Sequence, residues 1–504
     1  MQKKQLTLVI VSLLVVVLSV SLAYFTAQII GKGKNVSVTS ANLQIVFTDS
    51  DGAISGSNIE PGWSDTKTFT IKNDTKTEYK YNIVIKDLLN TFVTNGYLKY
   101  KITSTNSGYN MTEFKDVPKS SAAKDKILTY SVVIPNGVTQ SYTIEFKYAN
   151  DESVDQSIDM GKKLSGTLFI TEGTEPTLLS QLLADKSTVL TRTDFSKVLT
   201  NNNTNTLYTS TEDSKTVYYF AGNPTDNWVK FGKNASNQDL YWRIIRTNSD
   251  GSIRLLYHGT STTATDAVIN THTAFNSTYK DPMYVGYMYG TSNATSMDRS
   301  NTNNSTIKTV IDNWYKSNLE AKGYTKYLST TAVYCNDRSI TDGTYSIDSS
   351  FDYAARTRLK TNKTPSYDCA TTEDKFTVDK STGNGKLTYP IALMTADEVS
   401  FAGGVYLKNA LAWYYNNSAN ESSTDETFWW LLTPDHWNGG EYSYASVLFV
   451  RTDSFNWGKI DDKEVEVSSM GVRPAISIKS CVKYSSGDGT ADNPYTIKET
   501  TSGC

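Results

Sequence analysis

This sequence of 504 residues contains few histidines, and neither positive nor negative charge is in clear excess. With 49 Lys and Arg against 52 Asp and Glu, the net charge is only −3, which excludes a generally cationic nucleic-acid binder. Charged residues make up 20 % of the chain, too few for a protein kept disordered by its own charge. The 3 histidines leave little material for acid–base chemistry, whereas the 33 tyrosines favour a surface that makes contacts.

Catalytic and cofactor-binding motifs are missing as well. The sequence has no H-E-x-x-H, no G-x-S-x-G, no P-loop and no glycine-rich dinucleotide turn. The four cysteines include no C-x-x-C pair, so a zinc site is not expected. We therefore predict a protein that is not an enzyme and that holds no cofactor and no metal ion.

The N-terminus has the pattern of an export signal. Lys3 and Lys4 precede an apolar run from Leu6 to Phe25 that no charged residue interrupts. A basic flank before an apolar stretch is typical of a signal peptide, and Ser21-Leu22-Ala23 supplies a cleavage site of small residues. The run is also long enough to span a bilayer, which needs ~20 residues. Residues 1–31 are therefore a signal peptide or a membrane anchor, and in both cases the rest of the chain is extracellular or on the cell surface.

The cysteines agree with export, because an even number of cysteines in an exported chain predicts disulfides. All of them lie in the C-terminal half, at Cys335, Cys369, Cys481 and Cys504. Four cysteines allow three connectivities. We favour Cys335–Cys369 and Cys481–Cys504, because each pair closes a short loop and the second would tie down the C-terminal tail.

Alternation of apolar and polar residues with period two runs from Val36 to Ile170. On one stretch Tyr142, Ile144 and Phe146 face one way, while the polar residues between them face the other. About seven such strands, separated by turn residues, are typical of an antiparallel β-sandwich, in which each strand shows one face to the core and one to water. We predict an all-β sandwich over residues 35–173.

Short motifs in this region resemble the camelysin and biofilm-matrix-fibre proteins of Gram-positive bacteria. The resemblance covers about the first third of the chain and implies a secreted, jelly-roll-like sandwich that can assemble into surface fibres. Camelysins are also described as metalloproteases, but this region contains no histidine, so that activity is not carried over. The motifs are Ala23-Tyr24-Phe25-Thr26, Val38-Thr39-Ser40-Ala41-Asn42-Leu43, Glu60-Pro61-Gly62 and Lys67-Thr68-Phe69-Thr70-Ile71-Lys72.

Residues 174–216 are expected to be a polar linker with a short helix, followed by an α+β domain over residues 217–504. Asn248-Ser249-Asp250-Gly251 between two apolar stretches predicts a β-hairpin, because Asp-Gly accepts the positive φ values of a tight turn. Ser305 is a candidate N-cap for a helix. Thr395 and Glu398 match a capping box, which predicts a second helix from Ala396 to Ala402.

The second domain resembles a bacterial surface domain of unknown function, and more loosely C-type-lectin-like and formylglycine-generating-enzyme-like folds. The resemblance implies that Pro434 to Met470 forms a presented surface on a loop-bearing sheet. The domain lacks the W-N-D strand of calcium-binding lectins, and the Pro434–Met470 stretch lacks the cysteine pair of the generating enzyme. Its motifs are W-R-I-I at Trp242, W-W-L-L-T-P at Trp429, G-V-R-P-A-I-S-I at Gly471 and G-D-G-T-A-D-N-P-Y at Gly487.

Aromatic residues gather within this presented surface, mixed with Asn, Gly and Ser as in adaptable contact loops. The candidate ligand-binding residues are Trp437, Tyr442, Tyr444, Phe455 and Trp457. Adjacent Trp429 and Trp430 point to opposite faces of their strand and are expected to pack in the core. Arg473 is expected to form an ion pair inside the fold.

The sequence therefore predicts an exported cell-surface protein with a non-catalytic, adhesin-like C-terminal domain on a β-sandwich stalk. Its partner would be an extracellular glycan or protein, with the membrane as a second partner if the N-terminal helix is not cleaved. One alternative is a surface hydrolase acting on glycans, for which Asp435, Glu441 and Asp453 are the nearby carboxylates. Another is a fibre subunit that self-assembles through the strand edges of the sandwich.

Overall fold

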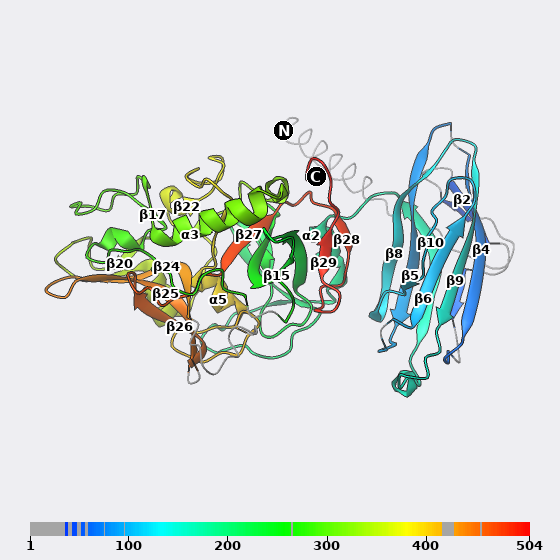
Figure 1. Ribbon diagram of the computed structural model, residues 1–504, viewed down its shortest axis with the longest axis horizontal. Coiled ribbons are helices and arrows are strands. Elements are labelled where there is room, and N and C mark those ends of the chain that lie inside the picture. The colour runs from blue at the N-terminus through cyan, green and yellow to red at the C-terminus, as the bar shows by residue number, and fades with distance from the viewer. Residues whose placement is uncertain are drawn as a thin grey trace, which may run out of the picture. The chain divides into compact units, whose positions relative to one another are not determined.

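The structure is a computed structural model that divides the chain into two compact units, Met1–Glu175 and Pro176–Cys504. It describes residues 36–38, 43–47, 52–55, 59–74, 76–94, 96–263, 266–415, 428–453 and 456–504 (Figure 1). The predicted signal peptide or anchor, residues 1–31, lies outside these ranges. Within them, none of the helices has the length and apolar character needed to cross a bilayer. Strands account for 39 % of the structure and helices for 12 %, so sheets form most of the framework.

The first unit contains two sheets and a short 3-10 turn, η1 (Ser157–Asp159). The larger sheet has the order β1 (Val36–Val38), β2 (Leu43–Phe47), β4 (Ser64–Asn73), β9 (Thr139–Tyr148), β6 (Leu98–Ser104), β7 (Lys115–Asp116). The smaller sheet has the order β3 (Ala53–Ser55), β10 (Leu164–Glu172), β5 (Tyr79–Asn90), β8 (Ser120–Ile134). All of these neighbouring strands pair antiparallel.

The core of the first unit follows from the predicted alternation. On β9 the residues Tyr142, Ile144 and Phe146 are buried, whereas Thr143 and Glu145 between them are not. Buried side chains of both sheets, among them those of β4, β9, β5 and β10, belong to one hydrophobic cluster. On β9 the period-two pattern therefore identified the inward residues, because that strand has one covered face, whereas on β5 the consecutive residues Tyr81 to Ile85 are all buried and the alternation does not hold.

The second unit is built on two larger sheets. One has the order β11 (Thr188–Thr191), β12 (Thr206–Glu212), β13 (Lys215–Tyr219), β15 (Asp239–Thr247), β14 (Trp228–Lys233), β29 (Tyr495–Ile497), β28 (Tyr484–Ser486). Three further strands branch from β15: β16 (Ile253–Gly259) pairs with β15, β27 (Pro474–Ile478) pairs with β16, and β23 (Ile391–Leu393) pairs with β27. The other has the order β20 (Ile340–Asp342), β21 (Phe351–Tyr353), β24 (Trp429–Asn438), β25 (Tyr444–Asp453), β26 (Asn456–Glu464). Two short pairs join β17 (Met288–Tyr289) to β18 (Asn303–Asn304) and β19 (Tyr334–Cys335) to β22 (Lys375–Phe376).

Short helices connect these strands. They are α2 (Leu178–Asp185), α3 (Thr306–Tyr315), α4 (Ala354–Arg356) and α5 (Ala396–Ala402), with the 3-10 turns η2 (Pro282–Val285), η4 (Tyr324–Tyr327) and η6 (Thr372–Asp374) and the π turns η3 (Lys316–Glu320) and η5 (Thr357–Asn362).

Local signals for the second unit are confirmed. The hydroxyl of Ser305 accepts from the amide of Lys308 at the start of α3. Thr395 and Glu398 form the capping box of α5, and β15 pairs with β16 across the predicted hairpin turn. The helix cap, the capping box and the hairpin turn each span only a few residues, so the local sequence is enough to determine their conformation.

The boundary between the units differs from the expected one. Residues 174–216 contain the predicted short helix, α2, but they also contain β11 and β12, which join the ten-stranded sheet through β13. The second unit therefore begins at Pro176 rather than at residue 217. β11 is an edge strand, and all four of its residues are exposed, including the apolar Val189 and Leu190.

The chain enters the second unit beside its own C-terminal region. Thr177 forms an antiparallel bridge with Lys483, and the amide of Leu178 donates to the carbonyl of Val482 at 2.9 Å. The disulfide Cys481–Cys504 closes directly next to this contact. The other disulfide joins Cys335 to Cys369, so the favoured connectivity is confirmed.

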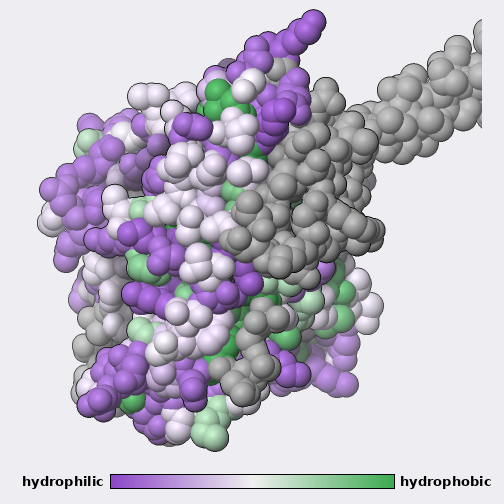
Figure 2. Space-filling model, turned by 90° about the vertical axis from the view of Figure 1, so that its right-hand side faces the viewer, coloured by the Kyte–Doolittle hydropathy of each residue, from purple (hydrophilic) through white to green (hydrophobic). Residues whose placement is uncertain are grey.

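The surface seen in Figure 2 carries mainly hydrophilic and intermediate residues, with small hydrophobic patches between them. Among the described residues the most exposed large apolar side chains are Met160, 82 % exposed, and Tyr442, 81 % exposed. Met160 belongs to the first unit and Tyr442 to the second. Because the two side chains are almost equally exposed, a substitution of one can serve as the control for a substitution of the other.

The Cys335–Cys369 disulfide gives a stability prediction. Because the bond closes a loop of 34 residues, replacing both cysteines by serine should lower the free energy of unfolding of the second unit by about 2–4 kcal/mol. Urea denaturation without reductant measures this change. An unfolding midpoint equal to that of the unmodified protein would contradict a structural role for the bond.

Candidate functional site

A polar cluster lies on the five-stranded sheet, inside the predicted surface from Pro434 to Met470. Asp435 and His436 are on β24, Ser446 is on β25 and Asp462 is on β26. These three strands pair side by side (Figure 1). Ser446 and Leu448 are two residues apart, and Leu448 lies opposite Asp462. Because residues two apart share a face of a strand, Ser446 and Asp462 point to the same side of the sheet.

Arg356 places a cation in this cluster. It ends α4, directly after β21, which pairs with β24. Its Nη1 contacts Oδ2 of Asp435 and lies 3.9 Å from Oδ1 of Asp462, and its Nε lies 3.2 Å from Oδ2 of Asp352. The hydroxyl of Tyr406 donates to Oδ1 of Asp462 at 3.2 Å. One guanidinium is thus shared by three carboxylates.

The imidazole of His436 makes its close polar contacts through Nδ1. This atom lies 2.7 Å from Oδ2 of Asp435 and 2.8 Å from Oγ of Ser446, while Nε2 faces the hydroxyl of Tyr444 at 3.4 Å. A serine nucleophile relay needs the serine on one ring nitrogen and the carboxylate on the other. Here both compete for Nδ1, and Ser446 is fully buried, so the arrangement does not activate a nucleophile.

Burial governs the electrostatics of the cluster. It raises the pKa of Asp435 above its ordinary value, and the charge of Asp462 raises it further, although hydrogen bonding to His436 and the charge of Arg356 act in the opposite direction. Burial lowers the pKa of Arg356, but attraction to Asp435 and the other acids outweighs burial and raises it overall. Asp435 is 0 % exposed, and its Oδ1 has no hydrogen-bond partner among the residues that the structure describes. With three carboxylates around one guanidinium, the cluster therefore has more acidic groups than cations.

The predicted ligand-binding aromatics divide into different environments. Trp437 is 1 % exposed, so its assignment to a binding surface is corrected: it lies opposite Ala445 on β25 and Phe351 on β21, on a central strand whose inner face is covered. Tyr442 is 81 % exposed. Tyr444 and Trp457 are half-buried.

The aromatic residues that remain accessible do not form one patch. Tyr444 begins β25, whereas Trp457 lies opposite Thr452 near the other end of that strand. At about 3.3 Å per residue, the two ends are about 26 Å apart. Phe455 and the side chain of Asp453 lie outside the described residues. The aromatic residue that contacts the polar cluster is therefore Tyr444, and Tyr442 lies on the turn just before it.

Two of the carboxylates suggested for a hydrolase, Asp435 and Glu441, lie in different environments. Glu441 is exposed on a turn and Asp435 is buried. The acid beside Asp435 is instead Asp462, which the sequence did not single out, and Arg356 and Tyr406 were also missed. These three residues come from separate segments, and only the strand register and the packing of α4 bring them to Asp435.

Arg473 is structural, but it does not form the expected ion pair with a described residue. It is buried, donates to the backbone carbonyls of Tyr257 and Tyr414, and lies 4.8 Å from the ring centre of Trp429. Burial, assisted by the nearby charge of Arg243, lowers the pKa of Arg473 to about 9.

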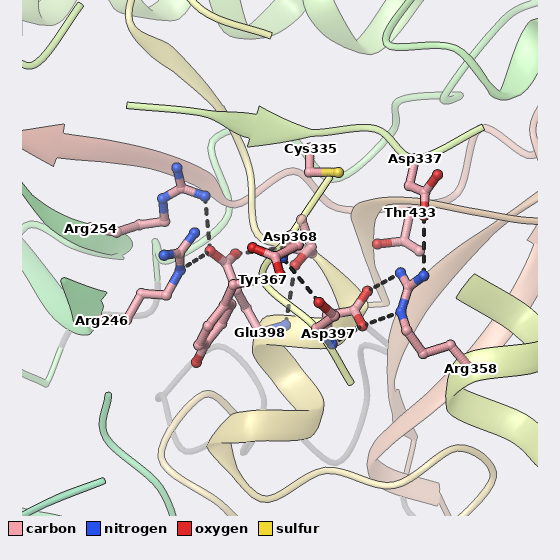
Figure 3. Close-up of a pocket in the computed structure, with 12 residues that line it drawn as sticks. Arg246, Arg254, Cys335, Asp337, Arg358, Tyr367, Asp368, Asp397, Glu398 and Thr433 are labelled. Atoms are coloured by element: carbon pink, nitrogen blue, oxygen red, sulfur yellow. Dashed lines mark hydrogen bonds and ion pairs between the residues drawn. The ribbon is translucent and has the colours of Figure 1, made fainter. Parts of the chain in front are cut away.

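A second polar centre is enclosed beneath α5 (Figure 3). Arg246 and Arg254 both donate to Oε1 of Glu398 at 2.8 Å. Arg358 binds both oxygens of Asp397 at 2.8 Å. The cavity between these groups has a volume of about 10 Å³, room for about one water molecule. Each of the three arginines is thus paired with a buried carboxylate, and Glu212 and Asp337 add two further acids, so we assign this centre a structural role.

Comparisons with protein-family models, with curated proteins and with solved structures found no match to this chain.

Replacing Glu398 by glutamine tests this buried centre. The change leaves two buried arginines without their shared carboxylate and should cost about 3–5 kcal/mol of stability at neutral pH. Burial alone would raise the pKa of Glu398, but Arg254 and Arg246 hold it below its ordinary value of 4.5. The ionised carboxylate therefore stabilises the fold above pH 4.5, and this contribution is lost as the pH falls through the lowered pKa.

Urea denaturation at neutral pH and at steps below pH 4.5 measures both effects. The stability difference between the two proteins should shrink as the pH falls, because the protonated acid resembles the amide. Asp194→Asn, at the exposed pair of Asp194 with Lys197, is the control and should change stability little. A stability difference that does not vary with pH would contradict the assignment.

Proposed function

We propose that the protein is exported and acts at the cell surface, where its second unit binds an extracellular glycan or protein without catalysis. The first unit would serve as a jelly-roll-like sandwich stalk, and the second as a C-type-lectin-like ligand-binding domain. The two disulfides support this proposal, because disulfides form and persist in oxidising compartments outside the cytosol. The resemblance of the first third of the chain to secreted fibre proteins supports it as well.

The observation that carries the proposal is that Tyr444 lies against the polar cluster, with its hydroxyl 3.4 Å from Nε2 of His436, while the exposed Tyr442 lies on the turn just before Tyr444. Exposed aromatic rings offer contact area at a low cost in conformational entropy, and sugars and protein side chains both stack on them. The partly exposed charges beside them can fix the orientation of a ligand. This combination occurs at the Tyr444 end of β25, so we place the binding surface there rather than at Trp457.

Recognition fits this surface better than hydrolysis does. Both the serine and the carboxylate contact one nitrogen of His436, and the buried Asp435 is already held by Arg356. A hydrolase of glycans needs two carboxylates facing one another across a substrate, one of them free to donate a proton. Asp435 and Asp462 instead share Arg356 between them.

A binding screen with the full chain against glycans and extracellular proteins tests the proposal. Tyr442→Ala should weaken the binding of any ligand found by at least tenfold, since a central aromatic anchor contributes about 2 kcal/mol or more. Met160→Ala, equally exposed but in the first unit, should leave binding unchanged. Surface plasmon resonance measures both affinities.

Trp457→Ala in the same screen locates the surface. Loss of binding in Trp457→Ala with full binding in Tyr442→Ala would move the site to the other end of β25. Equal losses in Tyr442→Ala and Met160→Ala would contradict a specific surface on the second unit.

A further inference from the structure

Three candidate metal ligands converge in the polar cluster. Single ligand atoms of Asp435, His436 and Asp462 all lie within 4.8 Å of one another. The Nδ1 atom of His436 is 2.7 Å from Oδ2 of Asp435 and 3.9 Å from Oδ2 of Asp462. Ligands bonded to one first-row divalent ion at about 2.0–2.2 Å lie roughly 3–4 Å apart, so small side-chain movements would bring these atoms into range.

The donor set selects among cations. Calcium and magnesium take oxygen ligands, whereas an imidazole combined with carboxylates suits zinc and its first-row neighbours. Asp435 and His436 are held on β24 and Asp462 on β26, so the scaffold is a paired sheet rather than a loop. A site on a sheet keeps its ligands in place before the ion arrives.

A second observation points independently to an occupant. Asp435 is completely buried, its Oδ2 is engaged, and no described residue donates a hydrogen bond to its Oδ1. A buried carboxylate oxygen without a partner is costly. Asp352, Asp435 and Asp462 share the single guanidinium of Arg356, so the cluster has room for more positive charge than it holds.

Arg356 already occupies the position that a cation would take. Its Nη1 contacts Asp435, lies 3.2 Å from Nδ1 of His436 and 3.9 Å from Oδ1 of Asp462. The side chain is partly exposed, and its Nε lies against the more exposed Asp352. Arg356 can therefore swing outward and keep one ion pair while it gives up the inner position.

We propose that Asp435, His436 and Asp462 form a binding site for a first-row divalent cation such as Zn²⁺ or Mn²⁺, and that the ion binds by displacing the guanidinium of Arg356. This site does not depend on which extracellular ligand the protein recognises. Displacement turns Arg356 toward the exposed side of the cluster, next to Asp352. The ion would thus change the charge presented beside Tyr444 without a change of fold.

Calorimetric titration of the metal-free full chain with Zn²⁺ alone and with Mn²⁺ alone tests the proposal. The unmodified chain should show saturable binding of one ion at this site. Asp462→Asn should weaken it by about tenfold or more, because a ligand is lost. Asp461→Asn is the matched control, since Asp461 is the preceding residue of β26 and pairs with Arg451 and Lys459 instead.

Arg356→Gln separates a metal site from an ion-pair cluster. Removal of the competing cation should tighten metal binding severalfold, and a gain of affinity cannot result from misfolding. Absence of saturable binding in both the unmodified chain and Arg356→Gln would overturn the site. Equal losses in Asp461→Asn and Asp462→Asn would also overturn it, and unchanged or weaker binding in Arg356→Gln would overturn the displacement of Arg356.

Discussion

The carboxylate of Glu398 holds the second unit together. One of its oxygens accepts from the backbone amide of Thr395 and so closes the start of α5, while the other accepts from Arg246 on β15 and Arg254 on β16. A helix cap and two buried arginines therefore depend on the same buried group. The residue before it, Asp397, binds Arg358, which follows Arg356 by two positions. Arg356 and Arg358 are thus close in sequence but pair with different acids, Arg356 with Asp435 in the polar cluster and Arg358 with Asp397 at the start of α5.

The surface cluster and the buried centre use similar residues for different purposes. Around Glu398 and Asp397 most cations and acids are matched and enclosed, and the remaining cavity has room for about one water molecule. Around Asp435 three acids share Arg356, and Asp462, His436 and Arg356 all retain some exposure. Removing one partner of an enclosed ion pair is costly because the other charge stays buried alone, whereas accessible acids that share too few cations can still bind a ligand.

The sequence predicted what is decided locally. The alternation on β9, the cap at Ser305 and the capping box at Thr395 were right, because each depends on neighbours a few residues away. Trp437 was wrong, since period two shows which residues share a face but not which face another segment covers. The cluster around Asp435 could not be predicted, because Arg356, Tyr406 and Asp462 reach it from separate segments through strand register and helix packing. The near-equal numbers of acidic and basic residues in the whole chain also gave no indication that acids outnumber cations around Asp435.

The contact of Thr177 and Leu178 with Val482 and Lys483 has a mechanical consequence. If the first unit tethers the protein to a cell and a ligand pulls on the second, tension enters that unit at Pro176 and passes at once into the segment after Cys481. The Cys481–Cys504 bond ties this segment to the end of the chain, so traction at the entry point cannot peel the last strands away one after another. A molecule built this way would resist fluid drag best while its sulfurs stay oxidised.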